Sequence, residues 1–337
     1  RSRMVLETFI EYGAPENIAY DSKPHIGTDI LTNVIRNMRE AIIKMGGVFL
    51  FETCLVGFEW ERDHVAAVRL KRTGSDSGNN EEFLIETQVA VLAIGHSARD
   101  TFQMLKDQGF AMEAKAFAVG LRVEHPQVFI NEHQYGPQAM KLLPAAPYKL
   151  TARLTNGRGA YSFCMCPGGY VVNVSSEPER LAVNGMSYSG RNGDNANSAI
   201  IITVNPQDFG GEGPLSGVEF QRRLEEKAWK LGGGLIPQQL FGDFERGRVS
   251  SAYGSYGSCT KGGTAMAPLH QLFSEEMKVS FVEGIHRFGE IIQGFDRYDC
   301  ILSGVESRTS SPVKIPRNQE FLSNKPGVYP CGEGAGY

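Results

Sequence analysis

Residues 327–337 read GVYPCGEGAGY, an apolar strand end followed by a turn of small residues. Small residues let a backbone approach a ligand closely, and the carboxylate of Glu333 can accept hydrogen bonds from hydroxyl groups. In α/β folds this pattern is typical of the carboxyl end of a strand where it meets a cofactor. Such a turn normally leads into a helix, and the sequence ends before one. We therefore expect a chain that is truncated within a binding site.

A second strand and glycine turn is expected at residues 89–97, VAVLAIGHS. Residues 89–94 are continuously apolar, as a buried parallel strand should be, and Gly95 opens the turn. Asp100 or Thr101 is placed to cap the helix that follows. Two glycine-rich strand ends this far apart in sequence fit a dinucleotide that lies across one sheet. The usual Gly-x-Gly-x-x-Gly signature after a strand is absent from the sequence.

The segment before this strand predicts helices and then an antiparallel meander. The chain opens on a helical pattern and continues through the loop KPHIGTD at 23–29 into a second helix, which Thr28 or Asp29 would cap. Residues 48–52 predict a short strand. The alternation of apolar and polar residues over 55–87 predicts hairpins.

Residues 115–310 have a different texture, with β-branched runs, helical patterns and loops rich in glycine and serine. The pattern predicts strands at 117–124, 170–175 and 200–204, and helices at 218–231 and 270–295. We interpret this region as a mixed α+β insertion in an α/β fold. The expected domains are then 1–114 with 311–337, and the insertion 115–310.

The composition disfavours several classes of protein. Of the 337 residues 41% are hydrophobic, which is ample for a core, and no uncharged run of 18 apolar residues predicts a membrane span. The 34 basic and 38 acidic residues give a net charge of −4, so nothing favours nucleic acid or an anionic membrane as partner. Six cysteines are too few for a disulfide scaffold and favour a reducing cytoplasm. We expect a small-molecule substrate, and the sequence leaves the oligomeric state open.

Cys164-Met165-Cys166 precedes a glycine turn and leaves three interpretations open. The two thiols could be redox-active or nucleophilic. A metal site is disfavoured because Cys-x-Cys lacks a convincing second pair of ligands, and we expect no metal. Alternate residues of a strand point to one face, so the two side chains could also simply pack.

Residues 305–312, VESRTSSP, combine an acid, an arginine and hydroxyls just before the last strand. The guanidinium of Arg308 could hold a carboxylate or phosphate, or it could form a structural pair with Glu306. The polar stretch 184–198 could bind a polar substrate or be a solvated turn region. Three histidines beside loops or strand ends complete the candidates: His25, His96 and His125.

Several stretches in order along the chain resemble one family. They include PHIGTD at 24–29, LAIGHSARDTFQML at 92–105, FCMCPGG at 163–169, GVESRTSSPVKIPR at 304–317 and GVYPCGEGAGY at 327–337. The chain resembles the bacterial FAD-dependent dehydrogenases, also described as NAD(P)-utilising, of the glutathione-reductase-like flavoprotein superfamily. Because the matches cover nearly the whole chain, the resemblance is more specific than any one motif.

The resemblance implies a partial three-layer, Rossmann-like FAD/NAD(P)-binding domain with a substrate domain inserted at 115–310. It implies FAD as cofactor and NAD(P)H as a possible electron donor, with the acid of Glu333 reaching the ribityl chain. The residues implied near FAD are Gly332, Glu333, Gly334, Ala335, Ala93, Ile94, Gly95, Cys54, Leu55, Gly27 and Thr28. Those expected to line the substrate pocket as catalytic candidates are Arg308, Glu306 and Cys166.

The chain departs from the family at both ends. The family begins with a βαβ unit that carries Gly-x-Gly-x-x-Gly, and this unit is not in the sequence. We therefore expect a fragment that is apo and inactive, from an FAD-dependent oxidoreductase that moves hydride through flavin to or from an unknown substrate. Two alternatives stay open: a non-catalytic binding or interaction module, and a thiol-dependent redox enzyme that uses Cys164 and Cys166.

Overall fold

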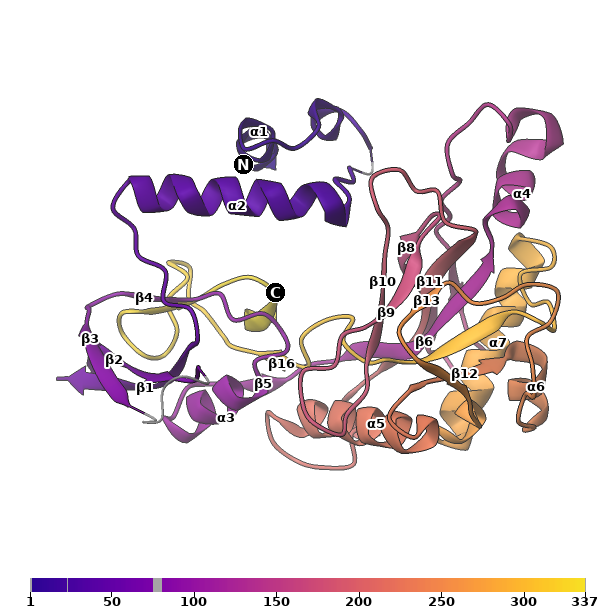
Figure 1. The fold of residues 1–337 in the computed structure, drawn as a ribbon. Coiled ribbons are helices and arrows are strands. Elements are labelled where there is room, and N and C mark those ends of the chain that lie inside the picture. Colours follow the sequence, from indigo (N-terminus) through magenta and orange to yellow (C-terminus); the bar gives the residue numbers. More distant parts are fainter. Residues whose placement is uncertain (1, 23, 75–80, 337) are drawn as a thin grey trace. The chain divides into compact units, whose positions relative to one another are not determined.

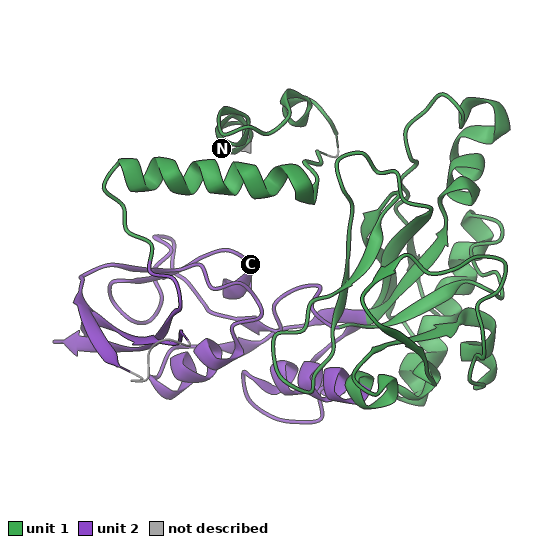
Figure 2. Ribbon diagram, viewed as in Figure 1, with its two compact units in different colours: residues 1–49, 120–202, 228–306 green, residues 50–119, 203–227, 307–337 purple. Residues whose placement is uncertain are grey.

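The protein is seen in a computed structural model that describes residues 2–22, 24–74 and 81–336. Lys23 and Tyr337, which belong to two of the stretches quoted above, lie outside the described residues. The chain divides into two compact units (Figure 2). Unit 1 consists of residues 1–49, 120–202 and 228–306, and unit 2 consists of residues 50–119, 203–227 and 307–337.

The first two helices of unit 1, α1 and α2, pack on each other (Figure 1). Ile30, Val34 and Met38 of α2 recur every four residues, so they form one apolar stripe, and this stripe packs with Ala14 and Ile18. The bounds of the helices are α1 Ser2–Glu11, η1 Glu16–Ala19, α2 Thr28–Lys44, α4 Gln127–Ala139, α6 Phe241–Arg246, η3 Leu269–Gln271 and α7 Glu275–Ile291.

A seven-stranded sheet in the order β14-β12-β15-β6-β11-β8-β7 forms the body of unit 1 (Figure 1). A second sheet has the order β10-β9-β13. Helix α7 packs on β7 and β8, and α6 packs on β12. The strand bounds are β6 Phe117–Pro126, β7 Thr151–Arg153, β8 Gly159–Cys166, β9 Tyr170–Asn173, β10 Val183–Met186, β11 Asn195–Val204, β12 Ile236–Leu240, β13 Thr260–Lys261, β14 Thr264–Met266 and β15 Ile301–Glu306.

Unit 2 contains an antiparallel meander β1-β2-β3, a parallel pair β17-β4 and an antiparallel pair β16-β5. Its elements are β1 Thr53–Glu61, β2 His64–Arg72, β3 Glu82–Glu86, β4 Ala90–Leu92, α3 Arg99–Asp107, β5 Glu113–Ala114, η2 Pro206–Asp208, α5 Ser216–Gly232, β16 Val313–Lys314, β17 Val328–Pro330 and η4 Glu333–Ala335. Three of the five bounds between the units fall within β6, β11 and α5. The other two follow residue 49 and the end of β15 at residue 306.

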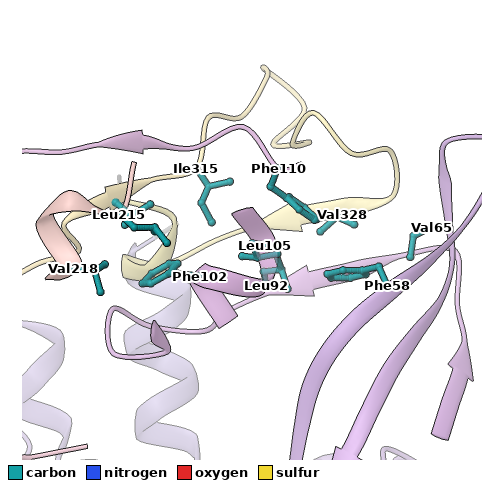
Figure 3. Close-up of a cluster of buried hydrophobic side chains, with 11 residues drawn as sticks. Phe58, Val65, Leu92, Phe102, Leu105, Phe110, Leu215, Val218, Ile315 and Val328 are labelled. Carbon is teal, nitrogen blue, oxygen red and sulfur yellow. The ribbon is translucent and has the colours of Figure 1, made fainter. Parts of the chain in front are cut away.

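A hydrophobic cluster brings together several elements of unit 2 (Figure 3). Leu92 of β4 and Val328 of β17 meet Phe102 and Leu105 of α3 in this cluster, and the meander contributes Phe58. All five side chains are at most 4% exposed. Burial of this apolar area therefore fixes the two parallel strands against the helix and the meander.

The expected α/β class is confirmed, with both parallel and antiparallel strands in the described residues. The first two helices, the meander and the strands near 117–124 and 200–204 lie where the pattern predicted them. The domain bounds 1–114, 311–337 and 115–310 stay a prediction. The compact units change near these bounds, but residues 1–49 and 203–227 are grouped differently.

Several local expectations are wrong. Residues 48–52 form no strand, and β1 begins at Thr53. Neither predicted cap forms at α2 or at α3, whose N-cap residues are Gly27 and Ala98. The carboxylate of Asp29 accepts hydrogen bonds from Ser189 instead, at 2.9 Å from N and 2.6 Å from Oγ.

The strand at 89–94 is shorter and more exposed than its apolar sequence predicted. Only Ala90–Leu92 is a strand, and it pairs with β17 alone among the described strands. Leu92 is buried, whereas Val89 and Val91 are 58% and 64% exposed. The apolar run therefore marked a parallel strand correctly but did not mark a strand that is buried on both faces.

Within the described ranges, no helix is both long and apolar enough to cross a membrane.

Candidate functional site

The two glycine turns of unit 2 leave the same edge of one parallel pair of strands. Ala90 is opposite Val328, and Leu92 is opposite Pro330. The amide of Cys331 donates to the carbonyl of Leu92 at 3.0 Å, which extends the pairing into the turns. Because the strands run in parallel, both turns emerge at their carboxyl ends, where α/β folds bind ligands.

The turns interlock through Gly334. A Cβ at this position would lie 2.4 Å from the carbonyl oxygen of Gly95 and 2.9 Å from Cγ1 of Ile94. Both distances are shorter than real Cβ contacts, and one of the atoms is backbone that cannot rotate away. Any larger residue at 334 would therefore push the two turns apart.

The first glycine of each turn faces the other way, into open space. Gly95 and Gly332 both have φ +66, and a Cβ built on either would meet no atom of the described residues within 4 Å. The two backbones are thus bare on one side and interlocked on the other. A ligand could approach both turns as closely as the peptide planes allow.

A polar contact joins the turns: Nδ1 of His96 lies 2.9 Å from Oε2 of Glu333. The two side chains are 23% and 34% exposed. Each residue follows the first glycine of its own turn, and this shared position is the signal that could have paired them from the sequence. Ala335 is buried, and its carbonyl accepts from the amide of Ile315 at 2.9 Å, so it anchors the turn to the core.

A buried carboxylate, Glu225 of α5, holds two arginines of unit 2. Nη1 and Nη2 of Arg99 donate to Glu225 at 2.8 and 2.7 Å, and Nε and Nη2 of Arg308 donate at 3.0 and 2.8 Å. Both pairs are therefore bidentate. Burial alone raises the pKa of Glu225, but the hydrogen bonds from Arg308 and Arg99 outweigh it and lower the pKa to about 2.

This cluster lies against the first glycine turn. Nη1 of Arg308 donates to Oγ of Ser97 at 3.4 Å, and Oγ of Ser307 donates to Glu225 at 2.6 Å. Gln221, one helical turn before Glu225, donates to the carbonyl of Ser307 at 2.8 Å. Arg308 is thus engaged by a carboxylate and fixes the end of the turn that contains Gly95.

Sequence reasoning missed Arg99, Gln221 and Glu225. Gln221 and Glu225 are fully buried and share a face of α5 with the apolar Val218 and Ala228. Their spacing of i, i+3, i+7 and i+10 places polar side chains on the core side of an amphipathic helix. A buried polar group needs a partner, so this pattern could have flagged both residues.

The other acid of the VESRTSSP stretch, Glu306, belongs to a cluster in unit 1. Its Oε2 lies 3.3 Å from Nη1 of Arg122, and both side chains are at most 2% exposed. Nε of Arg122 donates to Asn197 at 2.7 Å, and Nη2 donates to the carbonyl of Cys164. Burial raises the pKa of Glu306, and Arg122 only partly opposes this shift. The alternative that Glu306 and Arg308 pair with each other is therefore wrong.

The two thiols of Cys-x-Cys do not pack on one face, because β8 is irregular between them. Cys166 is opposite Asn197, but Phe163 is opposite Ala199, so β8 has one extra residue there. Cys164 is exposed with φ +43, whereas Cys166 is half-buried. Burial raises the pKa of Cys166 despite the nearby Arg122, which does not favour a reactive thiolate.

All six cysteines lie within the described residues, and none forms a disulfide. The described residues also contain no group of three His, Cys, Asp or Glu side chains that could hold a metal ion.

The polar stretch 184–198 is partly strand. Asn195, Asn197 and Ser198 are at most 2% exposed in β11, so a solvated turn is the wrong description for them. Nδ2 of Asn195, for example, donates to the buried carboxylate of Glu124 at 3.0 Å.

The remaining cofactor candidates have separate surroundings. In unit 1, Gly27 has φ +91, and a Cβ there would lie 2.5 Å from the amide nitrogen of Ser189. The hydroxyl of Thr28 donates to the carbonyl of Ser187 at 3.0 Å. In unit 2, Leu55 packs against the hydrophobic cluster, and burial together with Asp100 raises the pKa of its neighbour Cys54.

Two histidines of unit 1 have opposite environments. His125 is fully buried, its Nε2 lies 2.6 Å from the carbonyl oxygen of Phe295, and burial lowers its pKa to about 4. His286 lies between two carboxylates, 2.7 Å from Glu245 and 2.9 Å from Asp296. Partial burial lowers the pKa of His286, but the two carboxylates outweigh it and raise the pKa overall. His125 is thus a packed neutral ring.

Comparison with known proteins gives a family and a relative. The model of the family described as "FAD-dependent protein, C-terminal domain-like" matches residues 116–309. An uncharacterized protein of Clostridium beijerinckii (strain ATCC 51743 / NCIMB 8052) is 45% identical over 342 residues. The alignment covers 100% of this chain and 62% of that protein, so the chain spans less than two thirds of the relative's length.

Proposed function

The chain belongs to the family of FAD-dependent proteins with this C-terminal domain, and we propose that it forms part of an FAD-dependent oxidoreductase. The proposed reaction moves hydride through the flavin to or from a small-molecule substrate. The observation that carries the proposal is the interlocked pair of turns at Gly95 and Gly334, which leaves the first glycine of each turn bare toward solvent.

The residues present fit the cofactor. The open sides of Gly95 and Gly332 form a surface that a Cβ would partly fill, which is what close approach of a dinucleotide requires. In this proposal residues 93–95 and 332–335 hold FAD, and the carboxylate of Glu333 binds ribityl hydroxyls. Cys54, Leu55, Gly27 and Thr28 remain proposed neighbours on the strength of the family resemblance alone.

The chain's own groups would position the cofactor. His96, at 2.9 Å from Glu333, restricts the rotamer of that carboxylate. Arg308 and Glu225 hold Ser97 and therefore the end of the first turn. FAD, when bound, supplies the ring that accepts and donates hydride, and the protein supplies binding and orientation.

The test compares a glycine of the proposed flavin site with a glycine of similar conformation that lies in unit 1. Gly95 and Gly157 have φ +66 and +83, and a Cβ on either meets no atom of the described residues within 4 Å. Gly95→Ala and Gly157→Ala therefore introduce similar backbone strain. In the protein purified as its full natural chain, we expect Gly95→Ala to reduce the flavin absorbance per protein by more than about tenfold, and Gly157→Ala to retain it.

A colourless wild-type protein that takes up no FAD on incubation would contradict the proposal, as would equal flavin content in the two variants. The unfolding midpoint of each variant checks that both remain folded. Bleaching of the bound flavin by NADH or by NADPH, compared at equal concentration, then tests the expected electron donor. If flavin reduction persists in a Cys164→Ser/Cys166→Ser variant, thiol chemistry is not central.

A further inference from the structure

A cleft of about 360 Å³ lies within unit 1. Its lining contains none of the residues 93–95 and 332–335 proposed above to hold FAD, although it includes Gly27 and Thr28, which were proposed as neighbours of the cofactor. One wall is the loop 24–28 with Leu31 of α2. The other wall is residues 185–187, at the end of β10, with Cys166 of β8. Its volume is in the range of sites that bind small molecules.

The two walls are held together by direct hydrogen bonds. The amide and the hydroxyl of Thr28 both donate to the carbonyl of Ser187, at 3.3 and 3.0 Å. The hydroxyl of Ser187 in turn donates to the carbonyl of Pro167 at 2.9 Å. Asp29 and Ser189 add the pair of bonds described above. The cleft is thus built into the unit and does not depend on a ligand to form.

No charged side chain lines the cleft among the described residues. Its lining consists of aliphatic, glycine, hydroxyl and sulfur-containing residues and one histidine. That histidine, His25, has a pKa lowered by burial and by Arg191, so its ring is neutral at pH 7. The positive charge of Arg122 lies behind Gly185, where Glu306 and four other groups accept from its N–H groups. One of the four is Sγ of Cys166, at 3.3 Å.

The sulfur-containing side chains of the lining favour an aromatic ring. Cys166 and Met186 place sulfur atoms on the same wall, and sulfur packs favourably against aromatic rings. We propose that this cleft binds an uncharged aromatic compound of one or two rings.

An anionic ligand should be rejected for an electrostatic reason. A carboxylate that enters a cleft whose described lining has no charged side chain loses its hydration and gains no ion pair with the lining, so its transfer is unfavourable. The proposal concerns unit 1 alone and stands whether or not flavin binding by unit 2 is confirmed. Its test therefore uses binding and not turnover.

The experiment titrates the full natural chain with 2-naphthol and with 2-naphthoate at pH 7 and follows ligand fluorescence. The two probes share a ring system and differ in charge. We expect 2-naphthol to bind at least about tenfold more tightly than 2-naphthoate. We also expect 2-naphthol to slow the reaction of Cys166 with N-ethylmaleimide, measured by peptide mass spectrometry, and to leave the half-buried Cys54 of unit 2 unaffected.

A charge placed in the cleft should abolish the preference. Met186→Glu is expected to weaken 2-naphthol binding by at least about tenfold. Met45→Glu introduces the same charge at a side chain that is 77% exposed and outside the lining, and it should bind normally. If Met186→Glu does not fold, Leu31→Glu carries the charge into the cleft from a position that is 37% exposed.

The proposal is overturned if 2-naphthoate binds as tightly as 2-naphthol, or if neither probe binds. Binding of 2-naphthol without protection of Cys166 would overturn it as well, because the ligand would then occupy another site. The proposal is also overturned if Met186→Glu and Met45→Glu lose affinity for 2-naphthol equally.

Discussion

Each unit buries an arginine–carboxylate cluster, and the two carboxylates respond to burial in opposite directions. In unit 2, Glu225 accepts bidentate hydrogen bonds from Arg99 and Arg308, and its pKa falls to about 2. In unit 1, Glu306 faces only Arg122 among the described residues, at 3.3 Å, and its pKa rises. The number and geometry of the donors, and not burial itself, decide whether a buried acid keeps its charge.

The comparison is sharpened by the sequence. Glu306, Ser307 and Arg308 are consecutive, yet Glu306 joins the cluster of unit 1 whereas Ser307 and Arg308 join that of unit 2. Adjacent acid and base in a sequence therefore need not pair. Four predictions test this contrast.

The largest effect is expected at Glu225. Glu225→Gln leaves two guanidinium groups without their carboxylate in a buried position, so we expect a loss of about 3–5 kcal/mol in the free energy of unfolding. Urea unfolding measures it. Glu219→Gln, on the same helix but 54% exposed at its side chain, is the matched control and should change stability by less than about 1 kcal/mol. If Glu225→Gln also lost less than about 1 kcal/mol, Glu225 would not be the carboxylate that holds Arg99 and Arg308.

The acid limb of the stability profile should depend on Glu225. Its pKa falls from 4.5 to about 2 on folding, so its contribution is complete above pH 4.5 and is lost as the pH falls toward 2. That difference corresponds to roughly 3 kcal/mol. For Glu306 the folded pKa is raised, so its contribution is present below pH 4.5 and is lost as the pH rises through the folded value.

Unfolding free energies measured from pH 2 to pH 7 separate the two acids. Glu225→Gln should flatten the acid limb, and Glu306→Gln should remove a slope of the opposite sign. The same change of slope in both variants would contradict the contrast between the clusters.

A smaller loss of stability is expected when Glu306 itself is replaced. Gln keeps an oxygen that can accept from Arg122, and among the described residues Glu306 accepts a single hydrogen bond from that arginine, at 3.3 Å. We expect Glu306→Gln to cost about 1–3 kcal/mol, less than Glu225→Gln measured in the same buffer. A larger loss at Glu306 than at Glu225 would reverse the ranking of the two clusters.

The smallest effects are expected at two histidines of unit 1, whose pKa values are shifted in opposite directions on folding. His125 has a pKa lowered to about 4, so its contribution is complete above pH 6.5 and is lost as the pH falls toward 4. His286 has a raised pKa, so its contribution is present below pH 6.5 and is lost as the pH rises through the folded value. Thermal unfolding of His125→Gln and His286→Gln from pH 4 to pH 8 should show slope changes of opposite sign.

Much of the fold near the turns could be predicted from the sequence, because local signals carried it. The apolar run before Gly95 and the short one before Gly332 indicated strand ends, and β4 and β17 do pair in parallel. The burial of the strand was predicted wrongly, because burial depends on which elements pack against the strand. The exposure of Val91 depends on what covers the strand, and an apolar sequence does not state this.

The candidate site was predictable in part for the same reason. The sequence placed Glu333 and His96 at equivalent positions of two turns, but the 2.9 Å contact between them arises from tertiary pairing. The contact of Arg99 with Glu225 joins residues 126 positions apart, and no periodicity encodes such a distance. The predicted cap of α2 was wrong because the carboxylate of Asp29 accepts from Ser189, a partner 160 positions away in the chain.

The interlock of the turns has a consequence for how this sequence can vary. At Gly334 the space is already filled by the carbonyl of Gly95, so selection for folding alone should retain glycine there. At Gly95 the space is open, and selection for folding alone should tolerate residues such as asparagine that adopt positive φ. Glycine fixed at 334 but variable at 95 would therefore mark descendants that kept the fold and lost the ligand.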